Sequence, residues 1–178
     1  MKLLLLLSLI FSFSLFAAEN DISDNQIKVL NTVRNIAKAI PDTNGKTYEN
    51  TMSAICLTES SAGQNLIGDF HKNVPLTKAS LGVMQIQVQT VRYVASQVKK
   101  LSWIRSLNDS QIANRLLTDS EFSARIATHY FILLRHSRKN YMSSISGYNG
   151  GITNTPYFEK VTKSLEDIKA LKKEKKLS

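Results

Sequence analysis

The sequence has very little cysteine. Cys56 is the only cysteine in 178 residues, so the chain cannot form an internal disulfide, although small exported domains often depend on several. Its stability must therefore come from side-chain packing. Cys56 follows Ile55 in an apolar segment and no histidine lies near it in the sequence, so we expect a small packing residue rather than a catalytic thiol.

Strand-like alternation of apolar and polar residues is also scarce, and the sequence contains no internal repeat. The hydrophobic content of 43% is enough for a packed core and argues against global disorder. The length suffices for one compact domain. The histidines have no metal-ligand spacing with carboxylates or with Cys56, so we expect no metal site and no cofactor.

One long hydrophobic run is present, at the N-terminus. A single lysine precedes residues 3–16, which are apolar apart from serines, and two alanines follow before the sequence turns polar. This is the layout of a secretory signal peptide, expected over residues 1–18, with cleavage after Ala17 or Ala18. The run is short for a membrane-spanning helix, although an uncleaved anchor is the alternative. We expect an exported protein, in the periplasm of a Gram-negative bacterium.

Acidic residues are outnumbered, which gives a net charge of +9. In an exported protein, an anionic envelope polymer or a lipid surface fits this charge better than nucleic acid. The single domain expected over residues 19–178 ends in a basic tail that contains Lys169, Lys172, Lys173, Lys175 and Lys176. A solvated helix end with favourable charge at its C-terminus is the simpler interpretation of this tail.

Apolar residues recur at steps of three and four along most of the chain, which predicts a mainly α fold with at most a small β element. Pro41 ends the first helix, residues 63–80 form a loop, and Thr155 with Pro156 occupies the N-cap and N1 positions of the last helix. The helices are expected at residues 27–40, 47–61, 88–101, 110–117, 120–136, 141–146 and from 155 onward.

Glu59 stands out within the second of these helices. Ile55, Met52 and Tyr48 precede it at steps of four, three and four, so all four side chains share one helical face. A carboxyl group aligned with an apolar stripe is removed from water, which raises its pKa. An acid that stays protonated near neutral pH suits general acid catalysis. The alternative is a helix-end glutamate that reaches solvent or pairs with a lysine.

Four short segments in this order resemble the soluble lytic transglycosylase family, lysozyme-like enzymes that cleave peptidoglycan. They are Glu59-Ser60, the Gly-Val-Met-Gln-Ile segment at 82–86, the Tyr-Asn-Gly-Gly segment at 148–151 and the Tyr-Phe-x-Lys-Val segment at 157–161. The likeness covers nearly the whole mature domain. It implies a lysozyme-like α+β fold, a helical bundle around a glycan cleft, with peptidoglycan glycan strands as the substrate.

The sequence departs from the family pattern at several positions. Gly147 replaces the usual alanine, Phe158 replaces a valine or similar residue, and Val88 stands where many members have proline. The spacing from Glu59 to Gly82 is longer than in many members. The chain is more similar to the small transglycosylases associated with phages and secretion systems than to long modular ones, which implies envelope secretion machinery as a further partner. A monomer is the default expectation.

The resemblance implies a reaction that uses one carboxyl group twice. Glu59 would protonate the oxygen between N-acetylmuramic acid and N-acetylglucosamine, and would then deprotonate the C6 hydroxyl, which closes onto C1 as a 1,6-anhydro end. Glycoside hydrolysis usually needs two carboxylates, and Asp69 is the candidate for the second. If Asp69 reached the sugar, a hydrolytic muramidase on the same fold would result. The alternative is a turn aspartate that caps its own loop.

The resemblance also implies the residues that bind the glycan. Tyr148 would donate a hydrogen bond to Glu59, Gly82 would permit close backbone approach to the sugar, and Gln85 would bond its polar groups. Met84 would pack against a sugar face or in the core. The full substrate-binding set is Ser60, Ser80, Gly82, Met84, Gln85, Tyr148, Asn149 and Tyr157. Two other classes of function remain open: a non-catalytic peptidoglycan-binding or assembly module, and a basic protein that binds surfaces through its lysine tail.

Overall fold

The computed structural model describes residues 22–68, 74–138 and 140–178. The fold is mainly helical, as predicted, and strand pairing among the described residues is limited to the isolated bridges Ile67–Leu81 and Leu81–Ile86. The expected signal peptide and Asp69 lie outside the described residues. The elements are α1 (Asp24–Lys38), α2 (Glu49–Ser60), η2 (Leu76–Lys78), α3 (Val88–Gln97), η3 (Lys99–Ser106), α4 (Asp109–Thr118), α5 (Ser120–Ser137), α6 (Tyr141–Tyr148) and α7 (Thr155–Lys173).

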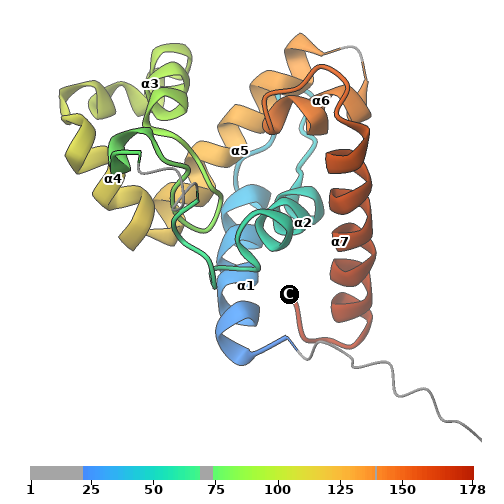
Figure 1. The fold of residues 1–178 in the computed structure, drawn as a ribbon. Coiled ribbons are helices and arrows are strands. Elements are labelled where there is room, and N and C mark those ends of the chain that lie inside the picture. The colour runs from blue at the N-terminus through green and yellow to red at the C-terminus, as the bar shows by residue number, and fades with distance from the viewer. Residues whose placement is uncertain (1–21, 69–73, 139) are drawn as a thin grey trace, which may run out of the picture.

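The helices form two groups that α5 joins. In the first group α2 lies between α1 and α7, and in the second α3, η3 and α4 pack together (Figure 1). Helix α5 contacts α1, α2, α3, α4 and α6, so it is the central helix of the core. The 82–86 segment lies against the second group, where Gly82 is next to the Leu116 carbonyl of α4.

Helix α2 is enclosed on all sides. The predicted apolar face is correct, because Tyr48, Met52 and Ile55 are buried. The other faces are buried too, since small residues such as Ser53 and Ala54 let neighbouring helices approach closely. The sequence had indicated a half-buried helix. Full enclosure means that packing fixes both ends of α2 in place.

Helix α1 holds the end of α2 through its own N-terminus. Ser23 and Gln26 form a capping box that starts α1, and the Gln26 side-chain Nε2 also donates to the Ser61 carbonyl, 3.0 Å away. Ser61 is the C-cap of α2 and has a left-handed backbone, with φ of 50°. The start of α1 therefore stabilises the turn that directly follows Glu59.

The apolar residues predicted to lie on one helix over residues 88–101 belong to two helices, α3 and η3. Val98 adopts an extended backbone, with φ of −112° and ψ of 105°, so α3 ends at Gln97 and the 3₁₀ helix η3 follows. Leu101 and Ile104 still reach the core from η3. A change of helix type keeps the apolar residues inward while the chain turns toward α4, and a regular periodicity does not reveal such a break.

The two helices near the Tyr-Asn-Gly-Gly segment differ from the predicted boundaries. Helix α6 continues through Tyr148, so the turn begins only at Asn149. Asn154 rather than Thr155 is the N-cap of α7, and its Oδ1 accepts a hydrogen bond from the Tyr157 backbone N–H at 3.1 Å. Asparagine caps a helix at least as well as threonine. Tyr148 therefore lies on α6 rather than in the turn, and Tyr157 lies in the first turn of α7, the helix predicted from residue 155 onward.

The predicted basic tail is not free. Leu171 and Leu177 are buried, and Ser178 donates its backbone N–H to Asn31 while its carbonyl accepts from Arg34. Two leucines among the lysines make this segment part of the core. In the part of the chain that the structure describes, no helix has the length and apolar character needed to cross a membrane.

Candidate active site around Glu59

Glu59 lies in the last turn of α2 and is half-buried. The Tyr157 hydroxyl donates a hydrogen bond to its Oε1 at 2.5 Å. Tyr157 itself is only 7% exposed, because the Asn154 cap starts α7 with this side chain directed toward α2. A buried phenol on one helix therefore holds a carboxyl group on another.

The surroundings of Glu59 favour its protonated form. Burial raises the pKa of Glu59 above its ordinary value, and the hydrogen bond from Tyr157 lowers it in part. A position at the C-terminal end of a helix also disfavours a negative charge. Among the described residues no lysine or arginine forms an ion pair with Glu59. The predicted burial and raised pKa are confirmed, and the alternative of a lysine partner is wrong for the described chain.

Tyr148 does not bond Glu59, contrary to the prediction. Its hydroxyl donates to the Met84 carbonyl at 2.9 Å, because the last turn of α6 directs the ring toward the 82–86 segment. Tyr148 is nevertheless a neighbour of the acid: burial, and then the Glu59 charge, raise the pKa of its phenol well above the ordinary value. Tyr157 holds the carboxyl group, and Tyr148 holds the backbone beside it.

Ser60 is a structural residue rather than a substrate contact. Its side chain is fully buried, and its Oγ donates to the Val83 carbonyl at 2.7 Å and accepts from the Gly63 backbone N–H at 2.9 Å. A buried hydroxyl with both partners inside the protein cannot reach a sugar. Ser60 instead joins the end of α2 to the 82–86 segment and caps the helix end through the Gly63 N–H. The predicted substrate contact is therefore wrong, whereas the other interpretation of Ser60, a cap at the end of its helix, is confirmed.

Gly82 and Met84 also face the protein interior. Gly82 has φ of +74°, and a Cβ at this position would overlap the Leu116 carbonyl oxygen of α4, so its close approach is to a neighbouring helix and not to a glycan. Met84 is fully buried, which excludes packing against a sugar and confirms the alternative of a core residue. Both residues belong to a turn that Leu81 and Ile86 close with paired backbone hydrogen bonds.

Gln85 is half-buried, with a left-handed backbone at the end of that turn. Its amide Nε2 donates to the carbonyls of Asn65 and Gly82, at 3.1 and 2.9 Å. Its Oε1 accepts no hydrogen bond from the described residues and lies beside Gly68. The side chain mainly holds the loop, and one acceptor oxygen remains for a ligand.

Ser80 and Asn149 remain accessible. Ser80 is half-buried and accepts the Gly68 backbone N–H at its carbonyl. Asn149 is exposed, and its Oδ1 accepts from the Asn154 side chain at 3.1 Å. With φ of −89°, Asn149 is not the left-handed turn residue, a conformation that Gly150 adopts instead. The sugar contacts expected of both residues stay predictions.

Cys56 lies one turn before Ser60 and is completely buried. Burial raises the pKa of its thiol to about 12, so the reactive thiolate is absent near neutral pH. The prediction of a small packing residue is confirmed. The thiol does not compete with Glu59 as the chemical group of this site.

The four segments that carry the family resemblance converge here. Three hydrogen bonds connect them: Tyr157 to Glu59, Ser60 to Val83, and Tyr148 to Met84. The family resemblance had assigned the phenol at Glu59 to Tyr148, whereas Tyr157 makes this contact. The better signal is the position of Tyr157 just after a capping asparagine, which directs it from the first turn of α7 toward α2.

Two pockets among the described residues lie away from Glu59. One pocket lies at the other end of α2, and a second is lined by residues of η2 and α3, including Lys78, Gln87 and Arg92. Neither includes Glu59 or its tyrosine partner. Within residues 22–68, 74–138 and 140–178, no cluster of His, Cys, Asp or Glu side chains is placed to hold a metal ion.

No family model, no curated protein and no solved structure matches this chain. The family expected from the four segments therefore stays a proposal. Its support is the chemistry of Glu59 and the contacts that bring those segments together.

Proposed function

We propose that this protein is a lytic transglycosylase that cleaves the glycan strands of peptidoglycan. The observation that carries the proposal is the environment of Glu59: a half-buried carboxyl group, bonded by a neutral phenol, with no cation beside it in the described chain. Such a group keeps its proton to higher pH than an exposed glutamate. A proton that is retained near neutral pH can be given to a leaving oxygen.

The proposed reaction follows from the two oxygens of this carboxyl group. Oε1 accepts from Tyr157, so the proton lies on the other oxygen and passes to the bridging oxygen of the glycosidic bond. The bond between C1 and that oxygen breaks, its electron pair leaves with the N-acetylglucosamine, and the 2-acetamido group stabilises the positive charge at C1. The Glu59 carboxylate then takes the C6 hydroxyl proton as O6 bonds to C1, which restores the acid.

One carboxyl group is sufficient for this sequence of steps, whereas hydrolysis by the usual route needs a second one. Among the described residues no other carboxylate acts on the pKa of Glu59, which burial and Tyr157 account for. Asp69, the candidate for a second carboxylate, lies outside the described residues, and the route proposed here needs Glu59 alone. The reaction as proposed uses no cofactor, and Gln85 Oε1 and Asn149 are the proposed polar contacts to the glycan.

The proposed setting is the cell envelope. Residues 1–18 have the layout of a signal peptide, and the substrate of a transglycosylase lies in the periplasm. Secretion machinery that must cross the wall is a proposed partner, nucleic acid is not, and the protein is proposed to act as a monomer. The positive charge of the chain suits an anionic wall.

Product analysis tests the proposal. Purified peptidoglycan is digested with wild type, with Glu59→Gln and with Glu159→Gln, a control at an exposed position of α7, and the fragments are weighed by mass spectrometry. We expect wild type and control to give anhydro ends, which are lighter by one water than reducing ends. Glu59→Gln should lose about 10²–10⁴-fold in rate. Reducing ends alone, or full activity of Glu59→Gln, would contradict the proposal.

A further inference from the structure

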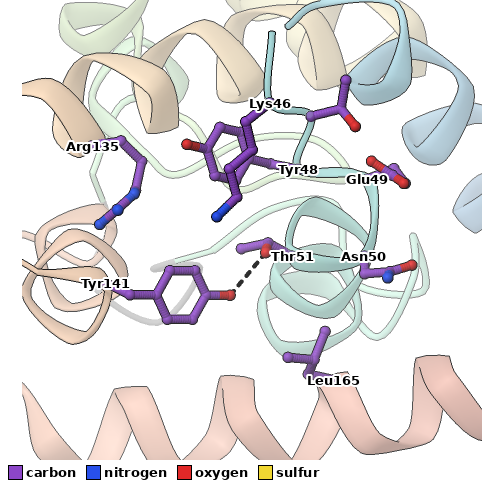
Figure 2. A pocket seen from close by; sticks show the side chains of 9 residues that line it. Lys46, Tyr48, Glu49, Asn50, Thr51, Arg135, Tyr141 and Leu165 are labelled. Atoms are coloured by element: carbon purple, nitrogen blue, oxygen red, sulfur yellow. Dashed lines mark hydrogen bonds between the residues drawn. The ribbon is translucent and has the colours of Figure 1, made fainter. Parts of the chain in front are cut away.

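A second site is present at the other end of α2. The pocket there has a volume of about 380 Å³, a size that suits a small ligand. It lies about 15 Å from Glu59 along the helix, at a rise of 1.5 Å per residue. The residues that shape it come from the start of α2, the end of α5 and the start of α6, and include Lys46, Tyr48, Glu49, Thr51, Arg135 and Tyr141 (Figure 2).

Two cations line this pocket without a carboxylate partner. The Arg135 guanidinium donates from Nη1 to Ser144 Oγ at 3.1 Å and lies 5.7 Å from the centre of the Tyr141 ring. Its Nε is buried and has no acceptor among the described residues, which is costly for a charged donor. Lys46 extends over the Tyr48 ring at 5.5 Å. Neither side chain forms an ion pair in the described chain.

The nearby acids are engaged elsewhere. Asp42 accepts from the Tyr48 hydroxyl at 2.7 Å and from two backbone N–H groups of its own turn. Glu49 also lines the pocket, but the charges of Arg34 and Lys172 act on its carboxylate. In Figure 2 the nitrogen ends of Lys46 and Arg135 lie toward the Tyr141 side of the pocket, away from Glu49. The Tyr141 side therefore keeps an unbalanced positive charge.

The backbone adds to this charge. Helix α2 begins at Glu49, and its N-cap, Tyr48, provides no side-chain hydrogen bond. The positive end of the helix dipole lies at this end, and the Glu49 carboxylate accepts a hydrogen bond from its own backbone N–H and so caps part of the first turn. The hydroxyl groups of Thr51 and Tyr141 form a hydrogen bond of 2.8 Å at the wall of the pocket (Figure 2). This hydrogen bond connects α2 to α6.

We infer that this pocket binds a small organic anion, whose carboxylate or phosphate group lies between Lys46 and Arg135. A guanidinium and an ammonium group both donate to oxyanions through charge-assisted hydrogen bonds. The rings of Tyr48 and Tyr141 and the Leu165 side chain provide apolar walls for a compact apolar body attached to the charged group. This binding site is separate from Glu59 and does not depend on the proposed glycan cleavage.

Anion titrations test the inference. Sodium phosphate and sodium acetate are titrated separately into the full protein by calorimetry, with sodium chloride holding the ionic strength constant. We expect saturable binding to wild type, and binding at least about tenfold weaker for Lys46→Gln and Arg135→Gln. Lys28→Gln, at an exposed position of α1, should bind as wild type does. Lys46 is itself exposed, so its variant should remain folded, which circular dichroism checks.

The two anions distinguish the sources of the charged group. Binding of both supports a shared oxyanion site, and binding of only one assigns the natural ligand to the phosphates or to the carboxylates. The inference is overturned if wild type binds neither anion. It is equally overturned if a folded Lys46→Gln variant binds both as tightly as wild type, or if Lys28→Gln loses as much affinity as the pocket variants.

Discussion

Glu59 at one end of α2, and Lys46 and Arg135 beside the other end, have no ion-pair partner in the described chain. At the C-terminal end, Glu59 is a half-buried acid whose side-chain partner is a neutral phenol. At the N-terminal end, Lys46 and Arg135 are cations without a carboxylate partner in the described chain. The two ends differ in their chemistry, because an acid lies beside a phenol at one end and two cations line a pocket at the other. The first group is suited to hold a proton and the second pair to hold an anion.

The packing of α2 between these ends fixes the positions of Glu59 and of the pocket. Its middle turns are buried on every side, with the small residues Ser53, Ala54 and Cys56 against their neighbours. Because these middle turns are closely packed, the residues at the two ends of the helix have little freedom to move. The acid and the cations therefore stay where the packing of α1, α5 and α7 places them.

The largest effect on the free energy of unfolding is expected from a substitution that removes contacts only at the Glu59 end of α2. Ser60→Ala removes the hydroxyl that serves both the Val83 carbonyl and the Gly63 N–H, and leaves buried backbone groups unpaired. We expect a loss of about 2 kcal/mol in the free energy of unfolding, measured by urea denaturation. Ser96→Ala, at an exposed position of α3, should change it by less than about 0.5 kcal/mol. Equal stabilities of the two variants would show that the Ser60 contacts do not hold this end.

A smaller effect is expected when the phenol is removed and the acid stays. The hydrogen bond from Tyr157 lowers the pKa of Glu59, so Tyr157→Phe should raise that pKa further. The proton is then retained to higher pH, and the alkaline limb of the pH–rate profile of glycan cleavage should move upward. The rate itself should fall about tenfold, the value of one good hydrogen bond. Tyr93→Phe, at an exposed tyrosine, is the matched control, and a downward shift of the limb would contradict the assignment.

The smallest effect is on the stability of Glu59→Gln. Because the folded-state pKa of Glu59 is raised above its unfolded value, the folded protein loses stability as pH rises through that range. Glutamine does not ionise, so the variant should melt a few degrees higher than wild type at pH 7. The difference should vanish as pH falls below about 4, where both forms are neutral. Melting curves at the two pH values measure it, and a variant less stable than wild type at pH 7 would count against a buried acid.

Sequence reasoning located Glu59 because steps of three and four report which side chains share a face of one helix. The family resemblance failed for the phenol, because Tyr148 and Tyr157 lie on different helices and the packing of α6 and α7 decides which hydroxyl reaches Glu59. It also failed for Gly82 and Met84, where an apolar turn has the same pattern whether it faces a sugar or α4. Lys46 and Arg135 are brought together by packing alone, and nothing in their sequence spacing predicts a pocket.

The central claim is that Glu59 holds its proton more tightly than an ordinary glutamate. Carbon-13 NMR of protein labelled at the glutamate carboxyl groups measures this directly, and the signal that disappears in Glu59→Gln assigns the residue. We predict a pKa for Glu59 above the ordinary value of 4.5, and a still higher one in Tyr157→Phe. A pKa at or below 4.5 would show that the carboxyl group is ionised and solvated, and would contradict its role as the proton donor.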